Sequence, residues 1–223
     1  MPTLHSVLVP SADTASRRLI VVLHGLGDSL RGWEWLPDEL RLPWLNTLLV
    51  NAPDDYHGGF SWYDLYGDPG VGIRRSRALI HDLLDNTRAS GFPSDQTVLL
   101  GFSQGCVMTL DAGLRYGESL AGLVGISGYV FDQEALVKEL KPHARAVPIL
   151  VTHGTRDPLL DIAPSREQIG FLQQAGLNVT WREYPKEHTV DFSRELPDLR
   201  QFLNACLSGK AGNSTAPVGR TSD

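Results

Sequence analysis

Cysteine is scarce in this chain, with only Cys106 and Cys206 among 223 residues. One falls in the predicted core and the other in the last predicted helix, so the disulfide framework of a small secreted domain is not expected. Basic residues are also few, and the formal net charge is −6. A protein that wraps nucleic acid needs a basic stripe, which this composition does not offer.

Long hydrophobic runs are missing as well. No apolar run approaches the roughly 20 residues of a membrane-spanning helix, and residues 1–18 lack the basic start and apolar stretch of a secretory signal. We therefore expect a cytoplasmic protein without stable membrane insertion. Hydrophobic residues make up 42% of the chain, which predicts one domain with a substantial core over residues 1–207. Residues 208–223 contain almost no large apolar side chain and predict a disordered tail.

Short apolar runs alternate with segments of helical character. The strands are predicted at residues 4–9, 19–23, 48–50, 97–100, 120–126, 148–152 and 179–184. Helices are predicted at 72–89, after the segment at 101–105 to about residue 116, at 132–140 and at 164–175. A last helix is predicted over an apolar stripe at 192–206, where Pro197 either starts the helix or kinks it. Strands that are apolar throughout are typical of a mostly parallel sheet covered by helices on both faces.

The clearest motif is Gly101-Phe102-Ser103-Gln104-Gly105, which follows an apolar run and precedes a predicted helix. A serine at a sharp turn between a strand and a helix is a nucleophile elbow. The two glycines leave room for the turn because they have no Cβ, and the helix N-terminus presents unpaired N–H groups. Ser103 is the predicted nucleophile. The alternative is a serine in an ordinary glycine-rich turn.

A serine hydroxyl needs an adjacent base, and an imidazole held by a carboxylate supplies one. His188 follows the last predicted strand, and Asp157 follows the strand at 148–152 directly. Because the carboxyl ends of parallel strands meet at one edge of a sheet, we expect Ser103, Asp157 and His188 to converge there.

Other residues compete for these roles. His24 and His153 also stand at strand ends, where an imidazole more often has a structural role. Asp161 is the alternative acid, and Asp191 stands close to His188 in sequence. Ser127 ends a strand but lacks the second glycine of the elbow pattern.

Two loops are predicted to border the site. The turn at 24–29 is expected to offer the backbone N–H of Leu26 to an oxyanion, although it could simply lead into a helix capped by Asp28 or Ser29. Residues 54–70 are rich in glycine, aspartate and aromatic residues. We expect them to form a wall or lid over an apolar cleft. Alternatively, Trp62 and Tyr63 only pack this loop onto the body.

Four segments together carry a resemblance: HGLGDS at 24–29 with Trp33 beyond it, GFSQG at 101–105, HGTRDP at 153–158, and His188 after the last strand. They resemble the α/β-hydrolase superfamily, and more narrowly the small carboxylesterase, lysophospholipase and acyl-protein thioesterase family, over about residues 15–206. The resemblance implies the α/β-hydrolase fold, a triad of Ser103, Asp157 and His188, and an oxyanion hole made by the N–H groups of Leu26 and Gln104. It also implies ester or thioester hydrolysis with no metal or organic cofactor.

The chain departs from that family at two positions. Cys106 stands where a glycine usually follows the elbow, and Glu187 stands where a glycine usually precedes the histidine. The larger Cys106 side chain predicts either a tighter site or a small shift of the helix.

The first hypothesis is a serine hydrolase of small-molecule carboxylic esters with short to medium acyl chains, acting through an acyl-enzyme. The residues predicted to line its apolar cleft are Leu30, Trp33, Trp62, Tyr63 and Leu159, beside Leu26. A thioesterase or lysophospholipase differs in leaving group and chain length, and a dienelactone hydrolase would need a cysteine at position 103. A non-catalytic binding module of the same fold is the alternative from another class. An apolar rim around the cleft could also be the contact of a homodimer.

Overall fold

A seven-stranded sheet forms the centre of the computed structural model, which describes residues 3–207. The strand order is β1-β3-β2-β6-β7-β8-β9. The edge strand β1 pairs antiparallel with β3, and every other pair in this sheet is parallel. The predicted tail at residues 208–223 lies outside the described residues.

The elements follow the predicted alternation of strand and helix. The strands are β1 (Ser6–Val9), β2 (Leu19–Leu23), β3 (Asn46–Val50), β4 (Asp54–Tyr56), β5 (Gly59–Ser61), β6 (Thr97–Phe102), β7 (Gly122–Ile126), β8 (Ile149–Gly154) and β9 (Val179–Tyr184). The α-helices are α1 (Leu36–Leu40), α2 (Pro69–Ala89), α3 (Gln104–Arg115), α4 (Gln133–Lys138), α5 (Ile162–Gln174) and α6 (Glu195–Leu207). Three short 3-10 helices lie at Leu30–Trp33, Ser94–Gln96 and Ala144–Ala146.

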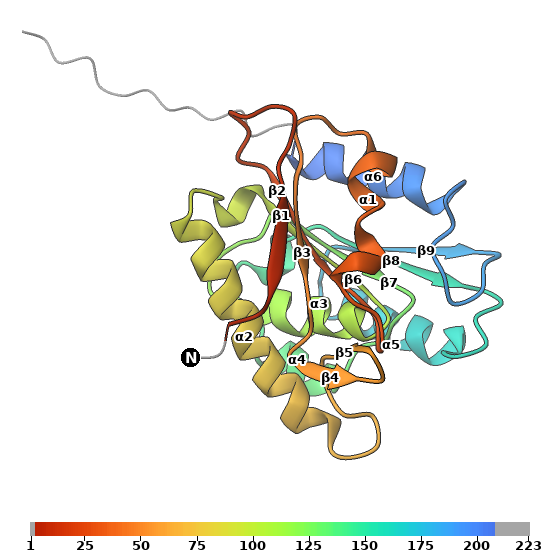
Figure 1. The fold of residues 1–223 in the computed structure, drawn as a ribbon. Helices are drawn as coiled ribbons and strands as arrows, with labels where there is room; N and C mark the ends of the chain where they lie inside the picture. Colours follow the sequence, from red (N-terminus) through yellow and green to blue (C-terminus); the bar gives the residue numbers. More distant parts are fainter. Residues whose placement is uncertain (1–2, 208–223) are drawn as a thin grey trace, which may run out of the picture.

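Helices cover both faces of the sheet, as predicted (Figure 1). Successive strand residues point to opposite faces. Leu19, Val21 and Leu23 therefore belong to the core on the face covered by α2, α3, α4 and α5, whereas Ile20 and Val22 belong to the core on the face covered by α1 and α6. All five residues of β2 are buried. This two-sided burial explains why the strand sequence is apolar throughout instead of alternating.

Local sequence explains where three helices begin. Helix α2 begins at Pro69 rather than at residue 72, because the Asp68 side chain accepts the Gly70 N–H and proline suits the first helical position. Helix α5 begins at Ile162 because Asp161 caps it. The sequence allowed the last helix either to begin at Pro197 or to be kinked there. Helix α6 (Glu195–Leu207) begins two residues earlier, so Pro197 lies in its first turn, where its missing N–H breaks no helical hydrogen bond.

Residues 54–61 form a β-hairpin rather than the predicted irregular loop. Strands β4 and β5 pair antiparallel, with Asp54 opposite Ser61. Within residues 3–207, no helix combines the length and the apolar composition that crossing a membrane requires.

Candidate active site

Ser103 occupies the sharp turn between β6 and α3. Its backbone has φ 55° and ψ −117°, a conformation that is costly for a residue with a Cβ and clusters at functional sites. The Ser103 N–H donates to the Ile126 carbonyl of β7 at 2.9 Å, and the Cys106 N–H donates to the Ser103 carbonyl at 3.0 Å. The strain is thus held by the neighbouring strand and by the first turn of α3.

The two glycines of the motif allow this turn by close backbone contact. A Cβ added at Gly101 would lie 1.9 Å from the Gly105 carbonyl oxygen, and one added at Gly105 would lie 2.1 Å from the Leu23 carbonyl oxygen. Any other residue at either position would push α3 away from the sheet. The spacing of the motif therefore follows from backbone sterics as the sequence predicted.

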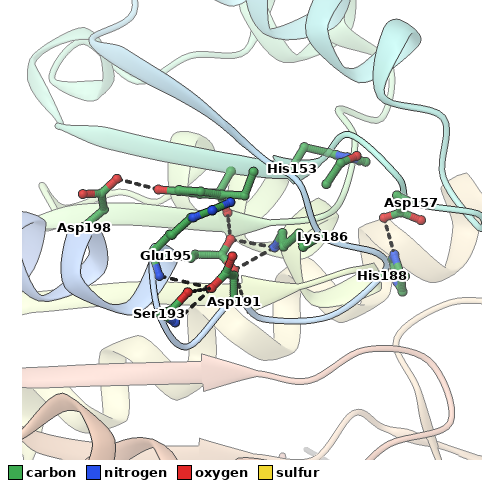
Figure 2. Close-up of polar contacts among 12 residues, drawn as sticks. His153, Asp157, Lys186, His188, Asp191, Ser193, Glu195 and Asp198 are labelled. Atoms are coloured by element: carbon green, nitrogen blue, oxygen red, sulfur yellow. Dashed lines mark hydrogen bonds and ion pairs between the residues drawn. The ribbon is translucent and has the colours of Figure 1, made fainter.

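The structure brings together Ser103, His188 and Asp157. His188 Nε2 lies 2.9 Å from Ser103 Oγ, and His188 Nδ1 lies 2.7 Å from Asp157 Oδ2. Figure 2 shows the contact of the imidazole with the carboxylate. The Asp157 side chain is fully buried, and the His188 side chain is 12% exposed. Substrate could reach the serine and imidazole while the carboxylate stays away from water.

The Asp157 carboxylate is fixed by its own turn. Its Oδ1 accepts the N–H groups of Leu159 at 2.9 Å and Leu160 at 3.0 Å. Burial raises the pKa of Asp157, but the hydrogen bonds from Leu160, His188 and Leu159 outweigh burial and hold that pKa below its usual value. The carboxylate is therefore ionised at neutral pH and aimed at His188 Nδ1.

The competing residues have other contacts. His153 is buried, and its Nδ1 lies 3.2 Å from the Gly154 carbonyl oxygen. Asp161 caps α5, and Asp191 accepts the Ser193 and Arg194 N–H groups before α6. Ser127 is buried with φ 49°.

His24 joins the ends of two strands. Its Nδ1 lies 2.6 Å from the Gly25 carbonyl oxygen, and its Nε2 accepts the Ala52 N–H at 3.1 Å. An imidazole that donates through Nδ1 and accepts through Nε2 is neutral. Burial lowers the pKa of His24 from its ordinary value.

This geometry predicts a pH dependence of stability. In the unfolded chain His24 takes up a proton below about pH 6.5, whereas the folded imidazole stays neutral to lower pH. The free energy of unfolding should therefore fall with decreasing pH, by up to about 1.4 kcal/mol per pH unit for this group. Urea unfolding at pH 7 and pH 5 should show a smaller fall in His24→Asn than in the wild type. An equal fall in the free energy of unfolding in both proteins would contradict a neutral His24 in the folded state.

The loop after β2 lies against the elbow. A Cβ added at Gly25 would lie 3.2 Å from the Ser103 Cβ. The Gly27 N–H donates to the Phe60 carbonyl and the Phe60 N–H to the Asp28 carbonyl, both at 2.9 Å. The N–H of Leu26 has no acceptor among the described residues. The hairpin thus fixes the loop that carries the Leu26 N–H.

The Gln104 side chain ties the segment after the hairpin to the elbow. Its Oε1 accepts the Trp62 N–H at 3.0 Å, and its Nε2 donates to the Tyr63 carbonyl at 2.8 Å. Sequence reasoning used only the backbone N–H of Gln104 and missed this second role. A buried amide next to a nucleophile is the signal that could have suggested it, because buried polar side chains need partners.

The residues predicted to line the cleft differ in how far they are exposed. Trp62 and Tyr63 are at most 1% exposed: Trp62 Nε1 donates to the His24 carbonyl, and the Tyr63 hydroxyl contacts the Tyr129 hydroxyl. The buried Trp62 ring therefore packs the segment onto the body, which was the alternative expectation for it. Tyr63, with Leu26, still lines a separate hollow of about 170 Å³ beside the hairpin. Leu30 is buried, whereas Leu159 is 72% exposed.

An aromatic cleft of about 220 Å³ opens beside His188, and Trp33 lines it. The other aromatic lining residues are Trp35, Phe102 and Phe192. Trp35 lies 4.7 Å from Phe192, and Phe102 lies 4.9 Å from His188, between ring centroids. Sequence reasoning missed Trp35 and Phe192 because they lie in separate segments that only the fold brings together.

Cys106 occupies a recess formed by two glycines. A Cβ added at Gly125 or Gly128 would lie 2.6 Å from the Cys106 Sγ. Burial raises the pKa of the Cys106 thiol to about 12, so the side chain acts as an apolar filler. Glu187, the second departure, is exposed.

Comparison with known proteins assigns the fold and the family. A family model described as phospholipase/carboxylesterase matches residues 5–207. The chain belongs to that family. It is 34% identical over 182 residues to acyl-protein thioesterase 1 of Schizosaccharomyces pombe, which covers 76% of this chain and 81% of the relative. It is 29% identical to a probable carboxylesterase of Oryza sativa subsp. japonica, over 88% of this chain and 82% of the relative.

Solved structures agree with this assignment. The crystal structure of esterase PE8 superposes with a TM-score of 0.80 at 26% identity, covering 92% of this chain and all of that one. SOBER1 of Arabidopsis thaliana superposes with a TM-score of 0.77 at 25% identity, covering 85% and 99%. The predicted α/β-hydrolase fold and the predicted carboxylesterase type of hydrolase are confirmed. Among residues 3–207, no cluster of three or more histidine, cysteine or acidic side chains could hold a metal ion.

Proposed function

We propose that this hydrolase cleaves carboxylic esters of short to medium acyl chain through Ser103, His188 and Asp157. The observation that carries the proposal is the continuous row of hydrogen bonds from Asp157 through His188 to Ser103 Oγ. A non-catalytic binding module has no need for a strained serine within hydrogen-bond reach of an oriented imidazole.

The reaction proceeds in two halves. Ser103 Oγ attacks the ester carbonyl carbon while His188 Nε2 takes the hydroxyl proton, and the backbone N–H groups of Leu26 and Gln104 donate to the oxyanion. The tetrahedral intermediate collapses, the C–O bond breaks, and His188 gives its proton to the leaving alcohol. Water then attacks the acyl-Ser103 ester with His188 again as base, which releases the carboxylic acid and restores the serine.

The aromatic cleft is the proposed site for the hydrocarbon part of the ester. It lies directly beside His188, and Trp33, Trp35, Phe102 and Phe192 supply the aromatic part of a lining that also contains Asp28 and Thr189. A cleft of about 220 Å³ suits a short or medium chain better than a long one. Leu159, exposed next to the Asp157 turn, would extend the apolar rim.

A thioesterase is the second candidate, because a relative 34% identical to this chain carries the name acyl-protein thioesterase 1. The same serine and imidazole can expel a thiolate. A lysophospholipase differs again in its leaving group. The cytoplasmic location and a homodimer remain predictions from the sequence.

Hydrolysis of nitrophenyl esters from acetate to palmitate, beside acyl thioesters of the same chain lengths, tests this proposal. We expect ester hydrolysis with a maximum at short to medium chains. Hydrolysis of long-chain thioesters alone would favour the thioesterase. Equal rates for the wild type and Ser103→Ala on every substrate would reject the serine hydrolase.

Trp35→Ala removes one wall of the cleft, and its effect should depend on chain length. We expect kcat/KM for the preferred ester to fall about fivefold to tenfold, since aromatic contacts contribute about 0.5–1.5 kcal/mol and more when area is lost. Acetate esters should change little. Trp44→Ala is the matched control, because Trp44 contacts the Arg18 guanidinium just before the start of β3 and does not line the cleft. The same loss of kcat/KM on acetate and on longer esters would show that the cleft does not bind the hydrocarbon chain of the ester.

A further inference from the structure

A buried ion pair lies beneath the loop that carries His188. Lys186 Nζ lies 2.7 Å from both carboxylate oxygens of Glu195, and the two side chains are 3% and 1% exposed. Figure 2 shows the pair between the strand end and α6, beside the contact of His188 with Asp157. None of the proposed chemical steps uses either residue.

The Glu195 carboxylate collects donors from both sides of the loop. Lys186 stands two residues before His188, and Asp191, whose N–H donates to Glu195 Oε2 at 2.9 Å, stands three residues after it. The Thr152 hydroxyl of β8 also donates to Glu195 Oε1. One carboxylate thus holds the start and the end of the loop against β8.

The Lys186 backbone ties the same loop to the turn that carries the acid. The Arg156 N–H, next to Asp157, donates to the Lys186 carbonyl at 3.1 Å. A Cβ added at Gly154 would lie 2.3 Å from that carbonyl oxygen, so β8 presses directly on the loop. The relative position of Asp157 and His188 therefore depends on where Lys186 is held.

Stability alone does not explain this arrangement. Burying two charges costs desolvation energy, and replacing such a pair by well-packed neutral residues is often neutral for stability. The pair instead fixes the conformation of the His188 loop, because a charged carboxylate with four donor contacts permits only one loop conformation. An imidazole displaced by a fraction of an ångström loses its alignment with the serine.

We propose that Glu195, with Lys186 as its counter-ion, is a positioning residue that clamps the His188 loop so that Nε2 stays within reach of Ser103 Oγ. This inference rests on the proposed function, since it concerns the same imidazole. It adds that the triad works only while Glu195 and Lys186 hold the His188 loop in place.

The double variant Lys186→Met/Glu195→Gln tests the clamp. It removes both charges and leaves no unpaired buried ion, so we expect a melting temperature within about 5 °C of the wild type. The value of kcat should fall about 10- to 100-fold while KM changes less than about threefold. Unchanged kcat in the folded double variant would overturn the proposal. Loss of activity in Ser103→Ala beside it would leave the proposed function intact.

A second pair of variants tests the clamp without removing charge. Thr152→Val keeps the shape of the side chain but removes the hydroxyl that donates to Glu195, whereas Thr152→Ser keeps the hydroxyl. We expect kcat to fall about threefold or more in Thr152→Val and to stay near the wild-type value in Thr152→Ser. Equal kcat in both variants would overturn the clamp even if the double variant fails to fold.

A buried pair elsewhere provides the matched control. Asp111 and Arg115 form an ion pair on α3, with side chains 3% and 9% exposed, and this pair does not contact the His188 loop. Because Asp111 also pairs with Arg77 and Arg115 with Glu139, the double variant Asp111→Asn/Arg115→Met should lower the melting temperature more than the Lys186 and Glu195 double variant does. It should leave kcat within about twofold. A matching fall of kcat in this control would show that any lost buried pair slows the enzyme and would overturn the specific role of Glu195.

Discussion

Ser103→Ala should lower kcat/KM for the preferred ester by about 10⁴-fold or more. The variant removes the oxygen that attacks the carbonyl but leaves the His188–Asp157 contact and the N–H groups of Leu26 and Gln104 in place. What activity remains would come from those N–H groups and from substrate binding. Initial rates with a nitrophenyl ester, at equal concentrations of folded protein, measure the loss.

Ser127→Ala provides the matched control for this loss. Ser127 directly follows the neighbouring strand β7, has a positive φ like Ser103, and is buried. Its hydroxyl makes no contact with His188 among the described residues, so we expect a rate within about threefold of the wild type. A large loss in Ser127→Ala together with a small loss in Ser103→Ala would reverse the assignment of the nucleophile.

Gly105→Ala should destabilise the protein by about 3 kcal/mol or more and abolish hydrolysis. The added methyl carbon would lie 2.1 Å from the Leu23 carbonyl oxygen and 2.7 Å from that of His24. Both are backbone atoms at the end of a buried strand, so neither can move aside cheaply. Helix α3 would have to shift, and with it Ser103 and the Gln104 N–H.

The contrast for Gly105→Ala is Gly170→Ala in the middle of α5. Nothing lies within 4 Å of a Cβ added at Gly170, and alanine is the better helix former by about 0.5–1 kcal/mol. We expect Gly170→Ala to raise the free energy of unfolding slightly and to leave activity unchanged. Urea denaturation of both variants measures the difference. A Gly105→Ala protein as stable as the wild type would show that α3 is not in tight contact with β2.

Much of the architecture could be predicted because strong local signals agree with the tertiary structure. Strand β2 is apolar at every position since both faces are covered, and the elbow motif has its glycines where backbones touch at Gly101 and Gly105. The order of Ser103, Asp157 and His188 along the chain, each after a parallel strand, was sufficient to predict that they converge. These inferences needed only periodicity, glycine sterics and the polarity of a parallel sheet.

The features that escaped prediction depend on partners distant in sequence. The hairpin of β4 and β5 consists of three-residue strands without an alternating pattern, so the sequence does not indicate it. The hairpin is held by backbone hydrogen bonds between Phe60 and the loop at Gly27 and Asp28. In the sequence Trp62 looks like an exposed aromatic residue of a loop, but in the structure its indole N–H donates a hydrogen bond to the His24 carbonyl. A recess for Cys106 exists because Gly125 and Gly128 lie opposite it.

Lys186 and Glu195 show the same limit for charged residues. Each is of a type that is rarely buried, and they are nine positions apart in the sequence, so each alone predicts an exposed side chain. Their burial becomes intelligible only once the loop after β9 folds back over the start of α6. A lysine two positions before a predicted base is the one sequence feature that could have drawn attention to the pair.

Covalent labelling is the sharpest test of the proposal that Ser103 is the nucleophile activated by His188. The wild type, Ser103→Ala and His188→Ala would be treated with an alkyl fluorophosphonate, and the modified peptide identified by mass spectrometry. We expect one label, on Ser103, that is absent in Ser103→Ala and formed far more slowly in His188→Ala. A label on another serine, or labelling of Ser103 that proceeds as fast without His188, would contradict it.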